Sequence, residues 1–371
     1  MLNTVVIGAG RLGGFHANKM AAHPDVDLRA IIDPSREARE RVAEATKTDQ
    51  TFADFSEVNE KIDAAVIASP TAYHHEIACD LLDRGIHVLV EKPICTTVEE
   101  ADELVDLAAA KGLVLQVGHI ERFNPAFRSV AGYVSDAKFI ESLRCGPFSF
   151  RSTDVGVVLD LMIHDIDLVL SLVHSPVRSV SALGVSVLGG HEDVANTRLE
   201  FENGCIATLS TSRVSYEAAR KMQIWSTGGF ASVDFNSRKR TLVQPNETLL
   251  RRRYDATNIS ADQIAEHQQL LTETLLPRQE EEFEAADPLQ LEANDFVASI
   301  EEGRPPLVTG KAGRDALEVA HRVLESIEHH AWDDHRDGLV GPMLQPRDQV
   351  IPMQQPEPAE VIDLRQPKKA G

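Results

Sequence analysis

The sequence predicts an α/β protein with two domains, a doubly wound parallel sheet followed by an α+β domain with a mainly antiparallel sheet. Apolar strands alternate with amphipathic helices over the first third of the chain, and pairs of short strands follow later. The length of 371 residues also exceeds the roughly 250–300 that one hydrophobic core usually serves. We expect the parallel sheet over residues 1–119, the α+β domain over 120–332 and a flexible proline-rich tail over 333–371.

A glycine motif follows the first predicted strand. Residues 4–7 are apolar and β-branched, the segment Gly8-Ala-Gly10-Arg11-Leu12-Gly13 comes next, and a helix can begin at Arg11. The first two glycines of such a turn let backbone N–H groups approach a pyrophosphate, and the third lets the helix pack closely on the strand. Asp33 ends the next strand, where a carboxylate can accept hydrogen bonds from an adenosine ribose.

This pattern predicts a Rossmann dinucleotide site, with contacts from Gly8, Gly10, Arg11, Leu12, Gly13 and Asp33. A glycine-rich turn in an unrelated α/β protein is the alternative. Asp33 would repel a 2′-phosphate, which favours NAD as the cofactor. The nearby Arg36 could reduce that repulsion, so NADP stays possible.

Three further strands, at residues 63–68, 86–90 and 113–117, alternate with helices at 73–84 and 98–111. Ligands of parallel sheets bind beyond the carboxyl ends of the strands. We therefore expect further cofactor contacts from Ser69, Pro70, His74, Glu91, Lys92 and Pro93. For His74, a capping or surface role is an equal alternative.

Lys92 follows a buried strand and is held by the proline after it. Its ammonium could stabilise negative charge on a reacting oxygen or donate a proton. An ion pair with Glu91 is disfavoured, because adjacent strand residues point to opposite faces.

Asp160 and His164 are four residues apart in a predicted helix over 160–173. That spacing places both side chains on one face of a helix, one turn apart. We expect a carboxylate and an imidazole to share one wall of a cleft. A metal site is the weaker reading, since the sequence shows no third ligand.

Short strands dominate the second half. They are predicted at 177–188, 197–201, 205–210, 222–226 and 230–234, with a hairpin signal at Asn203-Gly204. Residues 255–288, with the acidic run 280–284, predict an inserted helix or a solvated connection. Two helices follow, at 289–301 and 311–330. The histidines at 329, 330 and 335 are interpreted as surface residues.

The formal net charge of −21 argues against a nucleic-acid partner. The basic runs at 238–240 and 251–253 are therefore interpreted first as solvated turns, with a phosphate-binding role as the alternative. The four cysteines, Cys79, Cys95, Cys145 and Cys205, have no C-x-x-C spacing, which suits free thiols in a reducing compartment. With no signal peptide or membrane-spanning stretch apparent, we expect a cytoplasmic protein without a membrane partner.

The motifs together resemble the Gfo/Idh/MocA family of sugar and polyol oxidoreductases. In order, they are the glycine motif, Glu91-Lys92-Pro93, the segment 122–125, and Asp160-x-x-x-His164. The resemblance covers about residues 1–332. It implies a large open antiparallel sheet in the second domain, an active site between the domains, and a homodimer or homotetramer formed through that sheet. It also implies that Lys92, Asp160 and His164 line the site, with His164 as the acid/base.

Within the family, residues 118–126, 144–151 and 154–167 are most similar to the branch that oxidises UDP-N-acetylglucosamine at C3. A nucleotide sugar needs cations for its diphosphate, and Arg122, Arg144 and Arg151 flank the expected site. We expect the substrate to be bound by Arg122, Asn124, Arg151, Asp160 and His164. The alternative is that these arginines pair with acids such as Glu121 and Glu141.

The expected reaction is hydride transfer between a secondary alcohol of a sugar and the nicotinamide. His164 would remove the hydroxyl proton, Lys92 would stabilise the oxygen, and Asp160 would orient His164 or bind a neighbouring hydroxyl. Lys92 and His164 must then open into one cavity. The alternatives are an inositol or free-sugar dehydrogenase, an NAD-dependent glycosidase and a non-catalytic NAD-binding sensor.

Overall fold

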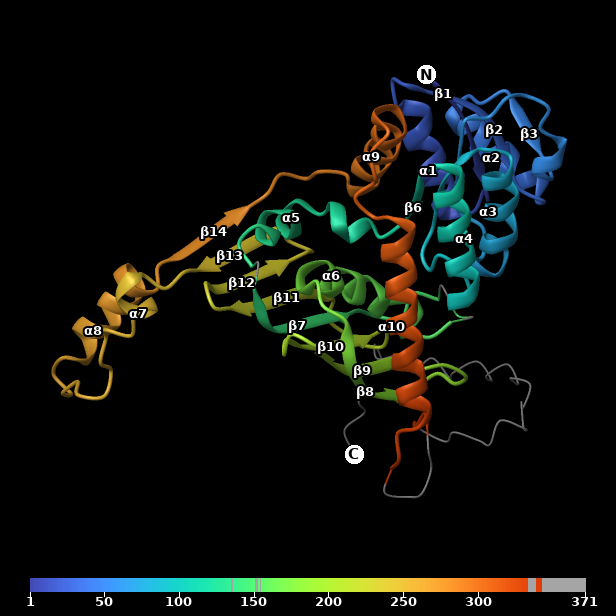
Figure 1. Cartoon of the computed structure of the whole chain (residues 1–371). Coiled ribbons are helices and arrows are strands. Elements are labelled where there is room, and N and C mark those ends of the chain that lie inside the picture. The colour runs from blue at the N-terminus through green and yellow to red at the C-terminus, as the bar shows by residue number, and fades with distance from the viewer. Residues whose placement is uncertain (135, 151–152, 154, 333–337, 342–371) are drawn as a thin grey trace, which may run out of the picture.

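The computed structural model describes residues 1–134, 136–150, 153, 155–332 and 338–341, which form two sheets joined by helices (Figure 1). The expected tail, residues 333–371, lies outside the described residues except for 338–341. The expected fold class is confirmed. Among the described helices, none is long and apolar enough to cross a membrane.

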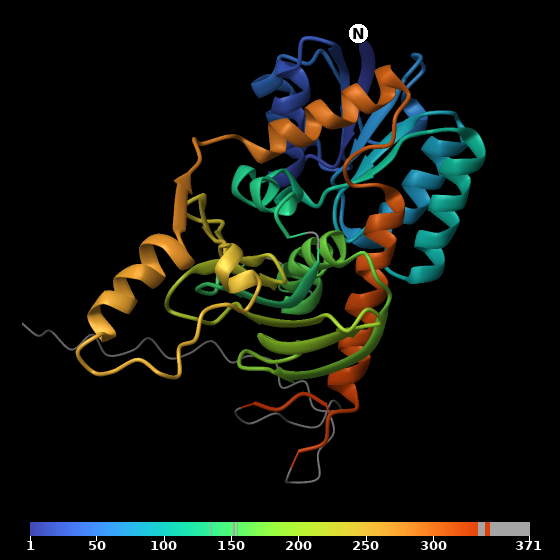
Figure 2. The ribbon, with the colours of Figure 1, turned by 60° about the vertical axis from the view of Figure 1, so that its left-hand side comes forward.

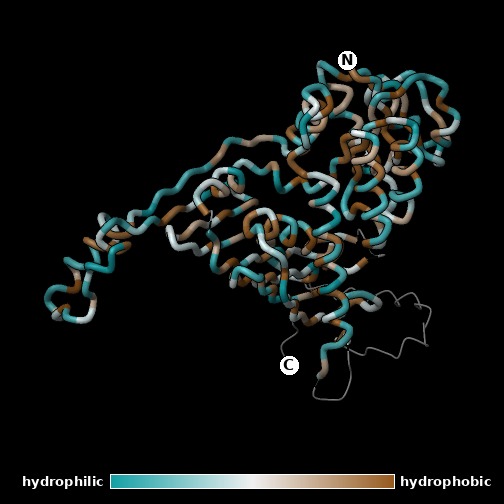
Figure 3. Tube along the Cα trace, viewed as in Figure 1, coloured by the Kyte–Doolittle hydropathy of each residue, from teal (hydrophilic) through white to brown (hydrophobic). Residues whose placement is uncertain are grey.

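The first sheet has six parallel strands in the order β3-β2-β1-β4-β5-β6, which is the order of a doubly wound dinucleotide-binding sheet. Its strands are β1 (Leu2–Ile7), β2 (Val26–Ile32), β3 (Gln50–Phe52), β4 (Ala64–Ile67), β5 (His87–Val90) and β6 (Leu115–Val117). Its helices are α1 (Arg11–Ala22), α2 (Arg36–Thr46), α3 (His74–Asp83) and α4 (Val98–Lys111). β4 is apolar throughout, because helices cover both faces of this sheet, and the hydropathy of the whole chain is drawn in Figure 3.

The bounds predicted for α4 coincide with those observed, because local signals mark both of its ends. The Thr97 hydroxyl accepts a hydrogen bond from the Glu100 amide at 3.2 Å, and the Glu100 carboxylate accepts one from the Thr97 amide at 3.1 Å. Gly112 ends the helix with a φ of 65°.

The second sheet has eight strands in the order β14-β13-β12-β11-β7-β10-β9-β8, all antiparallel except the pair β7 and β10. They are β7 (Ala137–Cys145), β8 (Val177–Val185), β9 (Val194–Phe201), β10 (Ile206–Ser212), β11 (Ala219–Ser226), β12 (Gly229–Asp234), β13 (Lys239–Val243) and β14 (Arg278–Glu282). The hairpin predicted at Asn203-Gly204 joins β9 to β10, with Gly204 at a φ of 82°.

One face of this sheet packs on α6 (Ile163–Val173) and α10 (Gly310–Glu328), and α5 (Pro125–Ala131) packs on β12 and β13. α10 also contacts α4, so it joins the two sheets. α9 (Pro288–Glu302) returns to the first sheet, where Ala293, Phe296 and Val297 enter the core beside α1 (Figure 2). Residues of the second half of the chain therefore complete the first core.

The predictions for the basic run 238–240 and the acidic run 280–284 are wrong in part. Arg238 lies in the expected turn, but Lys239 and Arg240 begin β13, and residues 280–282 belong to β14, which pairs with β13 in register. Lys239 pairs with Glu280 at 2.7 Å, and Arg240 pairs with Glu281. Opposite charges facing each other across two strands favour this pairing over a solvated turn. With the short helices α7 (Glu247–Leu250) and α8 (Ile264–Leu270), this segment projects from the body (Figure 1).

Candidate active site

The glycine loop after β1 leaves no room for side chains at two of its three motif positions. Gly8 has a φ of 98°, and a Cβ on Gly13 would lie 1.8 Å from the Gly8 carbonyl oxygen. By contrast, a Cβ on Gly10 would meet no atom within 4 Å. Gly10 therefore faces open space at the N-terminus of α1, where the loop can approach a phosphate group closely.

Asp33 holds this loop in place. Its carboxylate accepts hydrogen bonds from the Ala9 amide at 2.7 Å and from the Ser35 amide at 2.8 Å. Arg36 pairs with Glu40 at 2.6 Å on the exposed side of α2. The glycine loop and Asp33 thus fit a dinucleotide, and Arg36 already has an acidic partner within α2.

The turn after β5 is joined to the first sheet by buried polar contacts. Glu91 Oε1 lies 2.7 Å from Nε2 of His16 on α1, and Glu91 Oε2 accepts a hydrogen bond from the Lys92 amide at 3.1 Å. The ring nitrogens of His74 lie 2.9 Å from the carbonyl oxygens of Pro93 and Ser69. His74 is therefore a buried link between two of the expected cofactor loops, and Pro70 precedes the turn that leads into it.

Lys92 reaches across from the first sheet to the start of α6. Its Nζ donates to the Asp160 carbonyl oxygen at 2.7 Å and lies 3.2 Å from Asp160 Oδ1. The two side chains are 17% and 23% exposed, so the pair is shielded without being sealed from solvent. A contact between residues 68 positions apart thus joins the two halves of the site.

Asp160 and His164 lie at a break in the predicted helix. A π-helical turn, η4 (Val158–Met162), precedes α6, so the helix predicted over 160–173 has a wide first turn. Such turns are frequent at functional sites because they displace side chains from regular helical positions. Here Asp160 belongs to the π turn and His164 to the first turn of α6.

His164 is placed to act as a neutral base. Burial, followed by the positive charges of Lys92 and Arg144, holds the pKa of His164 well below its ordinary value of 6.5. Its Nδ1 is buried with no hydrogen-bond partner among the described residues. The buried ring of His119, at the end of β6, packs edge-on against it with ring centroids 6.1 Å apart. Neutral imidazole is the form that accepts a proton.

Lys92, Asp160 and His164 line one cavity of about 560 Å³. Arg11 and Leu12 of the glycine loop line the same cavity, so the expected cofactor loop and the expected catalytic groups meet there. The requirement that Lys92 and His164 open into one cavity is met.

The expected substrate arginines have partners within the protein. Arg122 binds Asp167 through two hydrogen bonds of 2.7 and 3.0 Å, and it does not line the cavity. Arg144 does line it, but pairs with Asp165 at 2.9 Å and Glu121 at 2.8 Å. Burial opposes a charge on Arg144, and the two carboxylates outweigh it, so its pKa is raised. Arg122 and Arg144 therefore follow the alternative given for the expected substrate arginines, in which they pair with nearby acids of the protein.

Asn124 accepts a hydrogen bond from the Ala126 amide at 3.0 Å and so begins α5. Its side chain is buried and does not line the cavity. Arg151, the third expected arginine, lies outside the described residues.

Several cavity residues were not predicted from the sequence. Arg220 at the start of β11 is the most exposed cation among them, with 53% of its side chain accessible and Glu121 3.8 Å away. The others include Phe15, Phe148, Arg213 and Asn236. No local motif marks these positions, because strands and loops far apart in sequence bring them together.

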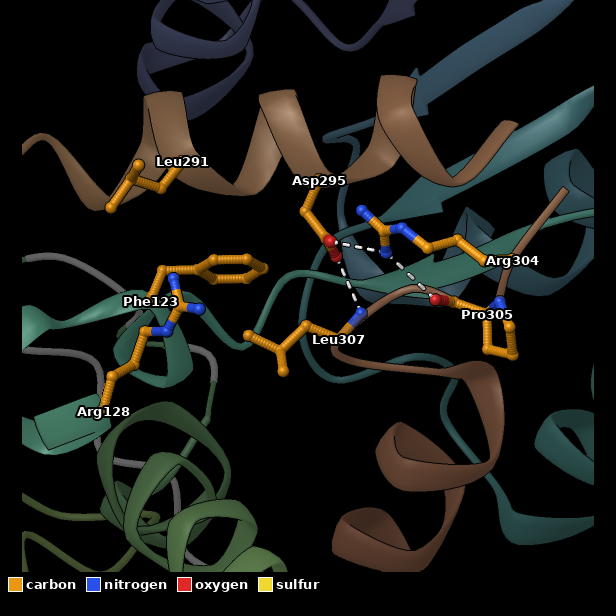
Figure 4. A pocket seen from close by; sticks show the side chains of 7 residues that line it. All are labelled: Phe123, Arg128, Leu291, Asp295, Arg304, Pro305 and Leu307. Carbon is orange, nitrogen blue, oxygen red and sulfur yellow. Dashed lines mark hydrogen bonds and ion pairs between the residues drawn. The ribbon is translucent and has the colours of Figure 1, made fainter. Parts of the chain in front are cut away.

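A second cavity, of about 400 Å³, lies between α9 and the turn before α5 (Figure 4). Its acid, Asp295, pairs with Arg304 at 2.9 Å and accepts a hydrogen bond from the Leu307 amide at 2.7 Å. None of the predicted site residues lines it. The cavity between the sheets is therefore the candidate active site.

Comparisons with known proteins agree with this geometry. Residues 2–119 match the oxidoreductase family with an NAD-binding Rossmann fold, and residues 140–232 match the GFO/IDH/MocA C-terminal domain. The chain is 34% identical over 332 residues to UDP-N-acetylglucosamine 3-dehydrogenase of Acidithiobacillus ferrooxidans, covering 88% of this chain and 97% of that protein. It is 27% identical over 333 residues to scyllo-inositol 2-dehydrogenase (NAD(+)) of Bacillus subtilis, covering 85% and 90%.

Solved structures extend the likeness. That of the Acidithiobacillus ferrooxidans dehydrogenase has a TM-score of 0.76 at 32% identity, covering 88% of this chain and 97% of its own. Scyllo-inositol dehydrogenase from Lactobacillus casei, solved with NAD(H) and scyllo-inositol, shares the fold with a TM-score of 0.69 at 20% identity, covering 88% and 96%. The expected resemblance is confirmed, and the chain belongs to the Gfo/Idh/MocA family of NAD-binding oxidoreductases.

Proposed function

We propose that the protein is an NAD-dependent dehydrogenase that oxidises a secondary alcohol of a nucleotide sugar, namely UDP-N-acetylglucosamine at C3. One observation carries the proposal. Lys92 and His164 open into a single cavity that the glycine loop also lines, and most of the charged residues around it are basic.

The residues of this chain divide the chemistry between them. His164, held neutral, takes the hydroxyl proton, a role typically worth about a hundredfold to ten-thousandfold in rate. The Lys92 ammonium stabilises the negative charge that develops on the same oxygen. Asp160 positions Lys92, since it binds Nζ through both its carbonyl and its carboxylate. NAD, when bound at the glycine loop and Asp33, supplies the hydride acceptor.

The charge of the cavity favours an anionic substrate over an uncharged polyol. Arg11, Lys92, Arg144, Arg213 and Arg220 all line it, in a chain whose net charge is −21. Arg144 is neutralised by its acids, whereas Arg220 is half exposed, and its ion pair among the described residues is a longer one of 3.8 Å with Glu121. Arg220 is thus a candidate to bind the diphosphate of a nucleotide sugar. The name of the Acidithiobacillus ferrooxidans relative supports the same substrate.

A substrate panel tests the proposal. The purified protein with NAD would be given UDP-N-acetylglucosamine, UDP-glucose, myo-inositol and scyllo-inositol, with NADH absorbance as the readout. We expect NADH to form with UDP-N-acetylglucosamine and not with the inositols. NADH formation with the inositols alone would show that the substrate is a polyol and not a nucleotide sugar. Sugar hydrolysis without net formation of NADH would identify a glycosidase. His164→Ala is the matched control, which should abolish turnover and retain NADH binding.

We also propose that the protein acts in the cytoplasm as a homo-oligomer. The four cysteines are free thiols, as suits a reducing compartment. The outer face of the eight-stranded sheet carries an aromatic cluster of Phe139, Trp225 and Phe230, with ring centroids 5.1–5.2 Å apart. A partner could cover these rings. Light scattering on the purified protein would give the number of subunits, and a monomer would contradict the proposal.

A further inference from the structure

A fully buried cluster of ionisable residues lies behind the candidate active site. It consists of His16 on α1, Glu91 at the end of β5 and Glu292 on α9. A ring nitrogen of His16 and one carboxylate oxygen from each glutamate lie within 4.8 Å of one another. Burying two carboxylates together is costly unless protons, cations or hydrogen-bond donors compensate the charge.

The two carboxylates differ in what compensates them. Glu91 accepts a hydrogen bond from the Lys92 amide at 3.1 Å. It also lies 2.7 Å from His16 Nε2, which can donate a second hydrogen bond to it. Both carboxylate oxygens of Glu292 have no hydrogen-bond partner among the described residues, and the side chain is 0% exposed. Glu292 thus lacks what an ionised carboxylate needs in the interior of a protein.

Asp295, one turn further along α9, shows what a compensated acid on this helix looks like. It pairs with Arg304 and accepts a hydrogen bond from the Leu307 amide (Figure 4). No comparable cation is bonded to Glu292 among the described residues. A hydrogen bond of 3.1 Å from Gln116 Nε2 to the Glu292 carbonyl oxygen anchors this turn of α9 beside β6. The Glu292 side chain is fully buried there, away from water.

We propose that Glu292 is a positioning residue that stays protonated beside the ionised Glu91 carboxylate, and so keeps the Glu91-Lys92 turn in register with His164. The link from Glu292 to Lys92 passes through the Glu91 carboxylate, which accepts a hydrogen bond from the Lys92 amide. Through this link, a helix from the second half of the chain sets the position of a residue at the end of β5. The role in turnover rests on the dehydrogenase function proposed above, whereas the protonation of Glu292 does not.

The electrostatics of the cluster support an asymmetric pair. Burial raises the pKa of Glu292 well above its ordinary value of 4.5, and the negative charges of Glu91 and Asp295 raise it further. For Glu91, burial acts in the same direction but is outweighed by the hydrogen bond from His16 and the charge of Lys92, so its pKa is lowered. When the pKa values of two neighbouring carboxyl groups differ in this way, one group is ionised and the other is neutral.

The sign of the pH effect follows from the raised pKa. Protonated Glu292 stabilises the folded state fully below its ordinary pKa, and this contribution is lost as pH rises through the folded pKa. The groups around it are His16 from α1, Glu91 and Lys92 from the turn after β5, and Asp295 from α9, which Arg304 compensates. Lys19 of α1 pairs with Asp287 at the start of α9, at 2.5 Å.

The test compares Glu292→Gln with Glu301→Gln, which makes the same change at an exposed position of α9. Glutamine is neutral at every pH and nearly isosteric with glutamate, so it imitates the protonated acid. From pH 5 upward, the melting temperature of Glu292→Gln should rise relative to the unmodified protein by about 2 °C per pH unit, until the folded pKa is passed. Glu301→Gln should show no such trend. Infrared difference spectra at neutral pH should contain a protonated-carboxyl band that Glu292→Gln lacks.

Turnover provides the positioning readout. Glu292→Gln should retain kcat to within about twofold, while Glu292→Ala should lower kcat by about tenfold to a hundredfold with a smaller change in the KM for the sugar. The proposal is overturned if Glu292→Gln is destabilised equally at all pH values, if the carboxyl band is absent, or if the protein contains a stoichiometric metal ion that Glu292→Gln loses. Should the protein oxidise no sugar at all, the function fails, while the melting and infrared results still decide the protonation of Glu292.

Discussion

Replacing Lys92 with methionine tests the core of the proposed chemistry, because methionine keeps the length of the side chain and removes its charge. In the structure Lys92 Nζ binds the Asp160 carbonyl and carboxylate and lines the cavity beside His164. The substitution thus removes a donor to the reacting oxygen and a positive charge near the imidazole.

Three effects can be estimated. Loss of one donor to a developing oxyanion costs about 3–4 kcal/mol, or roughly a hundredfold to a thousandfold in kcat. The 3.2 Å pair with Asp160 has a gross Coulomb energy of about 5 kcal/mol at an effective dielectric constant of about 20. Because Asp160 can turn toward the cavity water, the net loss of stability should be only about 1–2 kcal/mol. The pKa of His164 should rise, since the charge of Lys92 lowers this pKa more than any other charge around it does.

The assay is NADH formation from UDP-N-acetylglucosamine over a pH series, with melting temperature and NADH affinity measured in parallel. A neutral base is required, so the acid limb of kcat/KM should move to higher pH in Lys92→Met. Lys138→Met, at an exposed lysine on β7, is the matched control. A kcat within threefold of the unmodified protein, together with an unmoved acid limb, would refute the assigned role.

Further predictions concern the glycine loop, Asp33 and Arg220. Gly13→Ala should lower the free energy of unfolding by about 3 kcal/mol, because its Cβ overlaps a backbone carbonyl oxygen. Gly10→Ala, whose Cβ meets no atom, should leave unfolding nearly unchanged and still weaken NAD binding in titrations; equal effects of the two changes would contradict this. Asp33→Asn should lower the free energy of unfolding by about 1 kcal/mol, because it weakens the hydrogen bond from the Ala9 amide. It should also lower the ratio of kcat/KM for NAD to kcat/KM for NADP by about tenfold. An unchanged ratio would argue against a role of Asp33 in choosing the cofactor. Arg220→Gln should raise the KM for UDP-N-acetylglucosamine by about tenfold with kcat nearly constant. Arg178→Gln, the same change at an exposed arginine outside the cavity, should leave the KM unchanged. An unchanged KM in Arg220→Gln would show that Arg220 does not bind the diphosphate.

Five of the six strands of the first sheet were predictable because their signals are local, whereas the three-residue edge strand β3 was not predicted. Apolar runs separated by capped helices define the strands, and the bounds of α4 follow from Thr97, Glu100 and Gly112 alone. The order of motifs also led to the family, which the comparisons confirm. In contrast, β14 was missed because its residues, Arg278–Glu282, are polar and exposed, and only pairing with the basic strand β13 makes them a strand.

The candidate site was predicted in part. Lys92, Asp160 and His164 could be selected from the sequence because each follows a recognisable strand end or helical spacing. Of the acids that pair with Arg122 and Arg144, the sequence suggested only Glu121. Asp167 and Asp165 could not be selected, because an arginine binds whichever acids the fold places beside it. Glu292 likewise reads in the sequence as an ordinary helical acid, although it is fully buried behind Glu91.

The sequence alone thus determined most of the parallel sheet, the glycine loop and the choice of the side chains proposed to react, since each depends on residues that are close along the chain. Only the tertiary structure decided which charges are neutralised and which remain free to act on a ligand. Electrostatic partners are chosen by distance in space and by exclusion of water, and both arise only when residues far apart in sequence are packed together.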